Sequence, residues 1–133
     1  MSLLRFLQPP DWRRPLGYSN GVLAQGRQVF IAGQVGWNPC DGRFTNSSLP
    51  GQVAQALRNV LSVLAEAEGR PEHIVRMTWY LTSRTEYLAH LKEIGAAYRE
   101  VMGKHFPAMT AVEVTALVEP QAKVEIEATA VIP

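Results

Sequence analysis

Three histidines and one cysteine are the side chains of this chain that most readily bind metals or act as nucleophiles. The histidines lie far apart along the chain, and neither a cysteine nor a pair of carboxylates joins them, so no metal motif results. We expect surface or ordinary structural roles for His73, His90 and His105. Cys40 lies in a segment rich in turn residues, without a nearby histidine or lysine to activate its thiol, so we expect no nucleophilic role for it.

Phosphate and nucleic-acid binding are also disfavoured. The pair Gly33 and Gly36 lacks the Lys-Ser/Thr that follows in a phosphate-binding loop, and no helix comes directly behind it. The net charge is +1 and the basic residues are scattered, apart from Arg13 and Arg14. The chain therefore has no overall field to attract nucleic acid or an anionic membrane.

Length and composition indicate one soluble domain spanning residues 1–133, with an irregular lead-in over residues 1–15. The lone cysteine excludes an internal disulfide, and a reducing, cytoplasmic setting is the simplest interpretation. We expect no export signal, because the apolar start of the chain is interrupted at Pro9 and Pro10. No apolar run approaches the roughly 18 residues that a membrane span needs.

The chain alternates between strand and helix patterns. A β-rich run spans Val29 to Val35, and a second strand is predicted from Ile74 to Leu81. Between them, with Gly51 and Gly69 as its expected edges, a helix is indicated by one apolar stripe at helical spacing: Val53, Ala56, Leu57, Val60, Leu61 and Leu64.

A second helix follows in the sequence. Ser83 and Glu86 have the spacing of a capping box, and Gly103 is a good stop. One apolar face is expected along a single helix: Tyr87, Leu91, Ile94, Tyr98 and Met102. Two more strands are predicted, about Met109 to Leu117 and Lys123 to Ile132.

This order predicts an α+β two-layer domain, in which one sheet carries two helices on one face. Nothing in the chain is left to cover the far face, which would carry Glu125 and Glu127 among smaller and apolar neighbours. A sheet face left open in this way usually meets another subunit, so the pattern predicts oligomerisation.

Several short motifs, in order along nearly the whole chain, resemble the RidA/YjgF family. They lie at Gly17-Tyr18-Ser19 with Gly21, Val29 to Gln34, Gln52 to Val60, Phe106-Pro107-Ala108 and Val124 to Ala128. The resemblance implies a chorismate-mutase-like fold with a mixed sheet, and a barrel-cored homotrimer with a cleft between each pair of subunits. It also implies hydrolysis of reactive imines or enamines such as 2-aminoacrylate in those clefts, without a cofactor or metal.

The resemblance carries three site residues over to this chain. Tyr18 matches the family's cleft tyrosine, and Gly33 matches a glycine whose backbone can contact substrate. Glu125 matches the glutamate proposed to orient or activate water. Two structural alternatives stay open: Glu125 could be a hydrogen-bonding residue of the trimer interface, and Tyr18 could pack at the subunit seam. Glu127 is expected to be structural.

Three further site positions depart from the family pattern. Met109 stands where the family has the arginine that clamps the substrate carboxylate, and methionine can neither donate nor carry charge. Gly95 replaces an asparagine, and Ala111 replaces a small thiol or hydroxyl. An arginine from elsewhere could take over the lost role, and Arg13, Arg14 and Arg76 are candidates.

Two functions therefore remain open. One is a hydrolytic deaminase whose small-molecule substrate is an imine or enamine other than 2-aminoacrylate. The other is a non-catalytic trimer that binds a small metabolite or a regulatory partner in the same clefts. Ribonuclease activity is disfavoured, because the sequence has no basic stripe beside a stacking platform.

Overall fold

The structure is a computed structural model that describes residues 4–133. Its strands are β1 (Leu4–Leu7), β2 (Gly21–Ala24), β3 (Arg27–Val35), β4 (Ile74–Leu81), β5 (Ala108–Glu113) and β6 (Val124–Ile132). Its helices are α1 (Leu49–Ala65), the 3₁₀ turn η1 (Pro71–His73), α2 (Arg84–Ala89) and α3 (Leu91–Met102).

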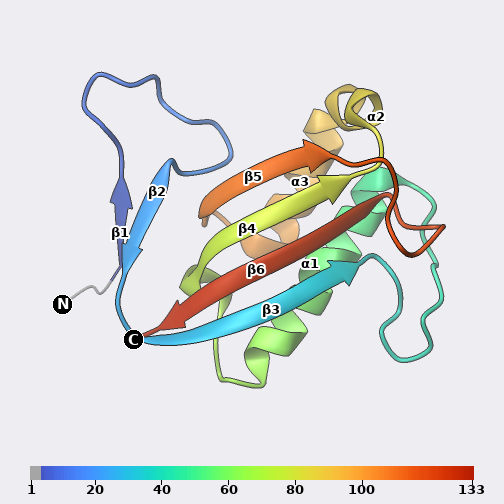
Figure 1. The fold of residues 1–133 in the computed structure, drawn as a ribbon, viewed down its shortest axis with the longest axis horizontal. Helices are drawn as coiled ribbons and strands as arrows, with labels where there is room; N and C mark the ends of the chain where they lie inside the picture. The colour runs from blue at the N-terminus through green and yellow to red at the C-terminus, as the bar shows by residue number, and fades with distance from the viewer. Residues whose placement is uncertain (1–3) are drawn as a thin grey trace.

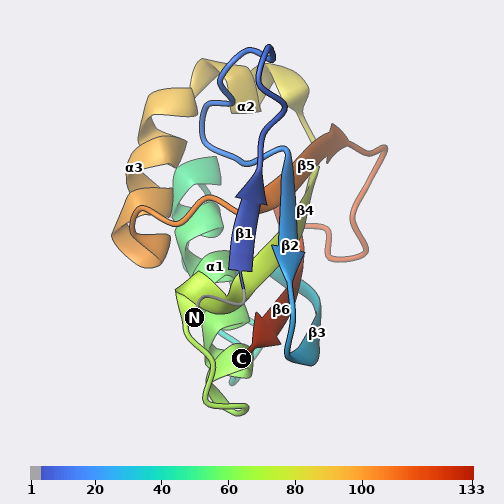
Figure 2. The same cartoon turned by 90° about the vertical axis from the view of Figure 1, so that its left-hand side faces the viewer.

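The main sheet has the strand order β3-β6-β4-β5. The pairs of β6 with β3 and β4 are antiparallel, whereas β4 and β5 run parallel. Helices α1 and α3 cover one face of this sheet (Figures 1 and 2). The predicted α+β two-layer domain, with a mixed sheet and two main helices on one face, is therefore confirmed, and it is the chorismate-mutase-like fold.

Strand β6 shows why the sheet has two different faces. Alternate residues from Val124 to Ile132 are buried, and the residues between them, including Glu125 and Glu127, are half-buried. Because successive side chains of a strand point to opposite faces, the buried set meets the helices and the glutamates lie on the other face.

Helix α1 buries the predicted apolar stripe, but it begins at Leu49, two residues before the expected edge at Gly51. The Ser48 side chain caps the helix by accepting a hydrogen bond from the Gly51 backbone N–H at 3.2 Å. Pro50 has no backbone N–H, which is tolerated because the N–H groups of the first turn have no carbonyl partner within the helix. Past the helix, Gly69 N–H closes the end by bonding the Leu64 carbonyl at 3.1 Å.

Two polar residues of α1 are buried and hold loops in place. Gln52 donates to the carbonyls of Asn46 and Gln121 and accepts from Lys123 N–H. Asn59 donates to the carbonyls of Val35 and Trp37. The Gln and Asn of the first-helix motif thus pair with backbone groups of the loops and strand ends around α1, and the bond from Asn59 to the Val35 carbonyl is fully buried.

The prediction of a single helix after Ser83 is wrong, because the chain forms two helices there, α2 and α3. Ser83 caps α2 through the Glu86 N–H at 3.0 Å, as the capping box predicted. His90 then leaves the helical region with φ −122° and ψ 25°, which ends α2 before α3 begins at Leu91. Leu91, in the first turn of α3, is half exposed, whereas Ile94, Tyr98 and Met102 face the core.

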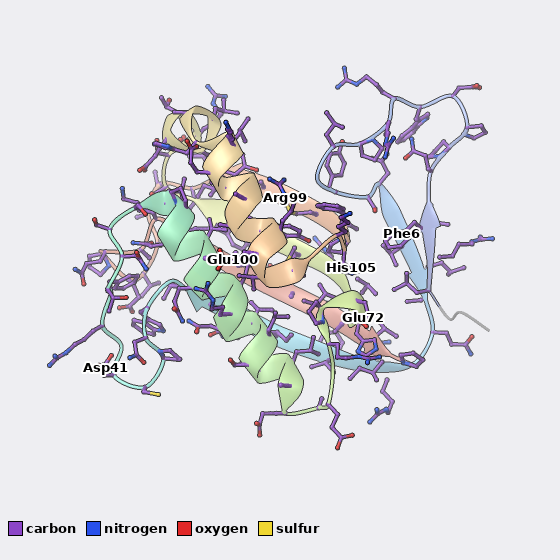
Figure 3. The ribbon with its side chains drawn as sticks, turned by 180° about the vertical axis from the view of Figure 1, so that it is seen from behind. Phe6, Asp41, Glu72, Arg99, Glu100 and His105 are labelled. Carbon is purple, nitrogen blue, oxygen red and sulfur yellow. The ribbon has the colours of Figure 1, made fainter. Side chains whose placement is uncertain are left out.

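The irregular lead-in expected over residues 1–15 contains strand β1, which pairs antiparallel with β2. This strand has too few residues for an alternating burial pattern to be recognised in the sequence. Its Phe6 ring packs on the ring of His105, with the two ring centroids 5.9 Å apart (Figure 3). Residues 1–3 of the lead-in lie outside the described part of the chain.

The strand expected to reach Leu117 ends at Glu113. Its partner β4 stops at Leu81, whose carbonyl accepts the Val114 N–H at 2.8 Å, so no strand backbone remains beside the next residues. Across residues 4–133, none of the helices has the length and apolar character required to cross a membrane.

Candidate ligand pocket

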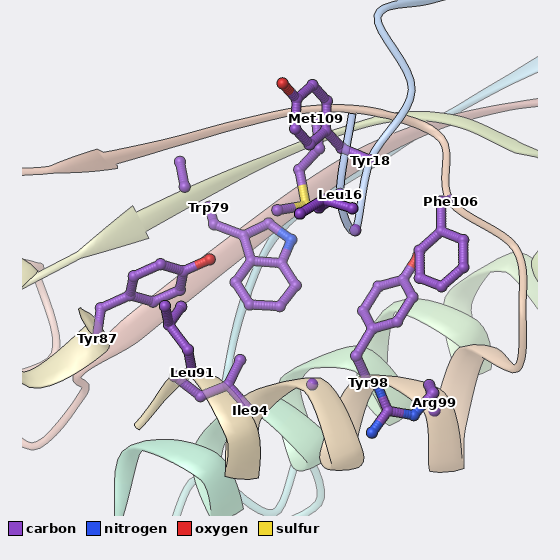
Figure 4. A pocket seen from close by; sticks show the side chains of 13 residues that line it. Leu16, Tyr18, Trp79, Tyr87, Leu91, Ile94, Tyr98, Arg99, Phe106 and Met109 are labelled. Carbon is purple, nitrogen blue, oxygen red and sulfur yellow. The ribbon is translucent and has the colours of Figure 1, made fainter. Parts of the chain in front are cut away.

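A pocket of about 490 Å³ lies between α3, strands β4 and β5, and the segment from Leu16 to Tyr18 (Figure 4). Most of its lining is apolar or aromatic. The lining side chains and glycines are Leu16, Gly17, Tyr18, Trp79, Tyr87, Leu91, Ile94, Gly95, Tyr98, Arg99, Phe106, Met109 and Ala111.

The pocket brings together four residues that the sequence analysis singled out: Tyr18, Gly95, Met109 and Ala111. The parallel register of β4 and β5 places Met109 beside Met77 and Ala111 beside Trp79. Residues directly opposite each other share a face of a sheet, so Met109 and Ala111 face the helices with buried Met77 and Trp79. Gly95 lines the same space from α3.

The segment that carries Tyr18 is held against the start of β5. Ser19 N–H donates to the Pro107 carbonyl at 3.0 Å, and the Ser19 hydroxyl donates to the Phe106 carbonyl. Gly17 has φ +79°, a left-handed conformation that side chains rarely adopt, which turns the chain just before Tyr18. Contacts almost ninety positions apart in sequence therefore position the tyrosine.

Aromatic rings form one wall of the pocket. Tyr98 stacks on Phe106 with ring centroids 5.5 Å apart, and its centroid lies 6.2 Å from that of Trp79. The Tyr98 hydroxyl donates to the His105 carbonyl. Burial raises the pKa of Tyr98 above the ordinary value of a tyrosine, so its hydroxyl keeps the donated proton further into the alkaline range.

Arg99 is the lining residue that sequence reasoning missed. The candidates for a replacement arginine were Arg13, Arg14 and Arg76, and none of them lines the pocket. Arg99 lies on α3 one turn after Gly95, and the i, i+4 spacing on a helix was the signal that could have found it. The missing side chain at position 95 leaves room for its guanidinium: a Cβ there would lie 3.3 Å from Nη1 of Arg99.

Gly33 and Glu125 are not in this pocket. Both lie where β3 and β6 meet, and a Cβ at position 33 would overlap the Glu125 carboxylate. Glu125 pairs with Tyr80 in the sheet register, on the face away from the helices. In one chain, the expected water-activating glutamate and the expected ligand pocket are therefore on opposite faces of the sheet.

Glu127 has a structural contact on that open face. The Tyr80 hydroxyl donates to Oε1 of Glu127 at 2.6 Å. This hydrogen bond is the main reason that the pKa of Tyr80 is raised, because ionising the tyrosine would break it.

The remaining candidate groups are separate from one another. His73 Nδ1 accepts from the Arg70 N–H, and a ring nitrogen of His105 bonds the Ile74 carbonyl. Cys40 is free and exposed. Across residues 4–133 there is no group of three or more His, Cys, Asp or Glu side chains that could hold a metal ion.

Comparisons with known proteins agree with the motifs. The sequence profile of the family described as endoribonuclease L-PSP matches residues 13–132. A RutC family protein of Aquifex aeolicus is 37% identical over 130 residues, which is 96% of this chain and 99% of that protein. A 2-iminobutanoate/2-iminopropanoate deaminase of Capra hircus is 32% identical over 114 residues, covering 86% of this chain and 79% of that protein.

The fold has a close match among solved structures. The Rid family protein YyfB of Yersinia pestis, described as of unknown function, superposes with a TM-score of 0.86 and 32% identity over 98% of this chain and 99% of that one. The YjgF gene product of E. coli gives a TM-score of 0.70 with 29% identity, over 87% of this chain and 88% of that one. The chain therefore belongs to the RidA/YjgF family, whose sequence profile is described as endoribonuclease L-PSP.

Proposed function

We propose that this protein is a RidA-like hydrolytic deaminase that converts a reactive imine or enamine metabolite to a carbonyl compound and ammonia. An enamine first takes a proton on carbon to become the iminium ion. Water then adds to the iminium carbon as a base removes one of its protons. The resulting amino alcohol transfers its hydroxyl proton to nitrogen, and the C–N bond breaks to release ammonia.

The observation that carries this proposal is the gathering of Tyr18, Gly95, Met109 and Ala111 around one pocket. These residues come from the N-terminal segment, α3 and β5, and the family motifs predicted them as site residues. Relatives named as 2-iminobutanoate/2-iminopropanoate deaminases support the reaction class. Met109 and the apolar lining argue for a substrate other than 2-aminoacrylate, whose body is small and polar.

Glu125 needs a second subunit to reach such a pocket. We propose a homotrimer in which the open sheet faces form a central barrel, and in which the two halves of each cleft come from neighbouring subunits. Phe30 supports this assembly, because it is 74% exposed on the open face opposite Thr129. A large apolar side chain exposed on an uncovered sheet face is typical of a subunit interface.

The test is ammonia release from freshly generated imines, with and without an α-carboxylate, by the purified oligomer. We expect wild type to exceed the uncatalysed rate and Glu125→Gln to lose roughly 100-fold or more, as removal of a general base does. The matched control is Glu127→Gln, two residues away on the same face, which can still accept the Tyr80 hydrogen bond. It should keep most of the activity.

One observation favours a second candidate function, a non-catalytic trimer that binds a metabolite or regulatory partner. No Asp or Glu lines the pocket within residues 4–133, so one chain lacks a base there. Such a protein would be stabilised against heat by some ligand and would release no ammonia from any imine of the panel. No acceleration by a folded wild-type trimer would reject the deaminase and leave this function.

A further inference from the structure

The Arg99 guanidinium is the charged group at the rim of the pocket. Among the described residues, its side chain makes no ion pair and no hydrogen bond, whereas its neighbour Glu100 pairs with Arg58 at 3.5 Å. It extends along α3 over Gly95, at the rim of the pocket (Figure 4). A helical side chain points back toward the preceding turn, so Arg99 covers the place that a residue at 95 would otherwise fill.

A buried donor in the same pocket also lacks a partner. Trp79 is 1% exposed, and within residues 4–133 its Nε1–H meets no acceptor. Buried polar groups in folded proteins nearly always have a hydrogen-bond partner, so an unsatisfied donor at a pocket indicates that something else supplies the acceptor. The hydroxyls of Tyr18 and Tyr87 likewise have no partner among the described side chains.

The charges of the lining point to one class of ligand. Arg99 is the single formally charged side chain among the lining residues, all of which lie within the described chain, and no carboxylate opposes it. Each of the free polar groups can donate a hydrogen bond, and the indole N–H and the guanidinium can only donate; the other two are phenolic hydroxyls. The rest of the surface is apolar or aromatic. A ligand that fits this lining has an acceptor-rich anionic end and an apolar body.

We propose that Arg99 is the anion-binding residue of this pocket, and that the pocket takes an organic carboxylate with a large apolar or aromatic body. The guanidinium would donate to the carboxylate from α3, whereas the arginine expected at position 109 would have done so from β5. Since Met109 is apolar, the place of the expected clamp becomes part of the surface that receives the apolar body. This inference rests on the proposed function only in placing the ligand in this pocket, and it does not require turnover.

The probe pair is 3-phenylpropanoate and its neutral counterpart 3-phenylpropanamide, with binding measured by titration calorimetry on the purified oligomer. Wild type should bind the carboxylate about tenfold more tightly than the amide, as a charge-assisted hydrogen bond allows. Arg99→Gln should remove that preference and leave amide binding within about twofold. Arg99→Lys should keep part of the preference, because the charge stays and the two-pronged geometry is lost.

Lys92→Gln is the matched control, since it removes an exposed positive charge from the same helix outside the pocket lining. It should change the affinity for either probe by less than about twofold. Raising the salt concentration should weaken carboxylate binding to wild type and leave amide binding unchanged.

Three results would overturn the proposal. The first is equal affinity of wild type for the two probes, and the second is that wild type binds neither probe. The third is an Arg99→Gln variant that melts like wild type but loses affinity for both probes to the same extent. The proposed deaminase activity is tested separately, by the imine assay. If the protein prefers the carboxylate through Arg99 but releases no ammonia, the anion-binding role of Arg99 stands and the deaminase activity is rejected.

Discussion

Gly33 leaves the space that the Glu125 carboxylate occupies. A Cβ built at position 33 would overlap Oε2 of Glu125, and it would also approach Cγ at 2.9 Å. A glycine in the middle of a strand often marks the close approach of another group. In this chain that group is the side chain predicted to activate water.

Gly33→Ala should therefore displace the Glu125 carboxylate and reduce ammonia release by roughly tenfold or more. The stability cost should be small, about 1 kcal/mol, because the atoms that must move belong to one flexible side chain and not to the backbone. Steady-state ammonia assays and urea unfolding measure the two effects. Gly21→Ala is the control, since its Cβ would meet Leu7 at an ordinary 3.4 Å. Full activity in Gly33→Ala would show that the position of Glu125 does not matter.

Gln52→Leu should destabilise the protein by about 2–3 kcal/mol. The substitution removes three partly buried hydrogen bonds that the buried Gln52 side chain makes to the backbone of Asn46, Gln121 and Lys123, and each such bond contributes roughly 0.5–1.5 kcal/mol. The free energy of unfolding in urea measures the change. Lys92→Ala, at an exposed position of α3 on the helical side of the sheet, should cost no more than about 0.5 kcal/mol. Similar values for the two variants would contradict the assigned role.

Tyr98 should make the protein lose stability at alkaline pH. Burial raises the pKa of Tyr98 above the unfolded value of about 10, so its contribution is fully present below that pH. Above it, the unfolded chain releases the proton more readily than the native protein, and stability falls as pH rises. Urea unfolding from pH 8 to 11.5 should show a shallower decline in Tyr98→Phe than in wild type. Parallel declines would contradict this assignment.

Phe30→Glu should dissociate the proposed trimer into monomers. The substitution puts a charge on the open face of the sheet, and burying that charge without a partner would be costly. Light scattering after size-exclusion chromatography gives the mass directly. Leu88→Glu, at a 56% exposed position of α2 on the helical side, should leave the mass unchanged. A trimeric Phe30→Glu variant would place the subunit contact elsewhere.

The sequence determined most of the fold through short-range patterns. The apolar stripe of α1 and the alternation of β6 are repeated over enough residues to define one buried face each, and the Ser83 cap marked where α2 begins. The family motifs led to Tyr18, Met109 and Ala111, which the structure places together in the pocket. Short elements such as β1, and the break at His90, carry too few residues for such patterns to show.

Only the tertiary structure decided what the pocket contains and what it lacks. The hydrogen bonds from Ser19 to the backbone of Phe106 and Pro107 bring Tyr18 to the sheet, and no local pattern encodes a contact between such distant segments. Packing of α3 on the sheet placed the uncharged Gly95 and the unpartnered Arg99 at one rim. The sheet itself separates Glu125 from that pocket, because alternate residues of a strand must point to opposite faces.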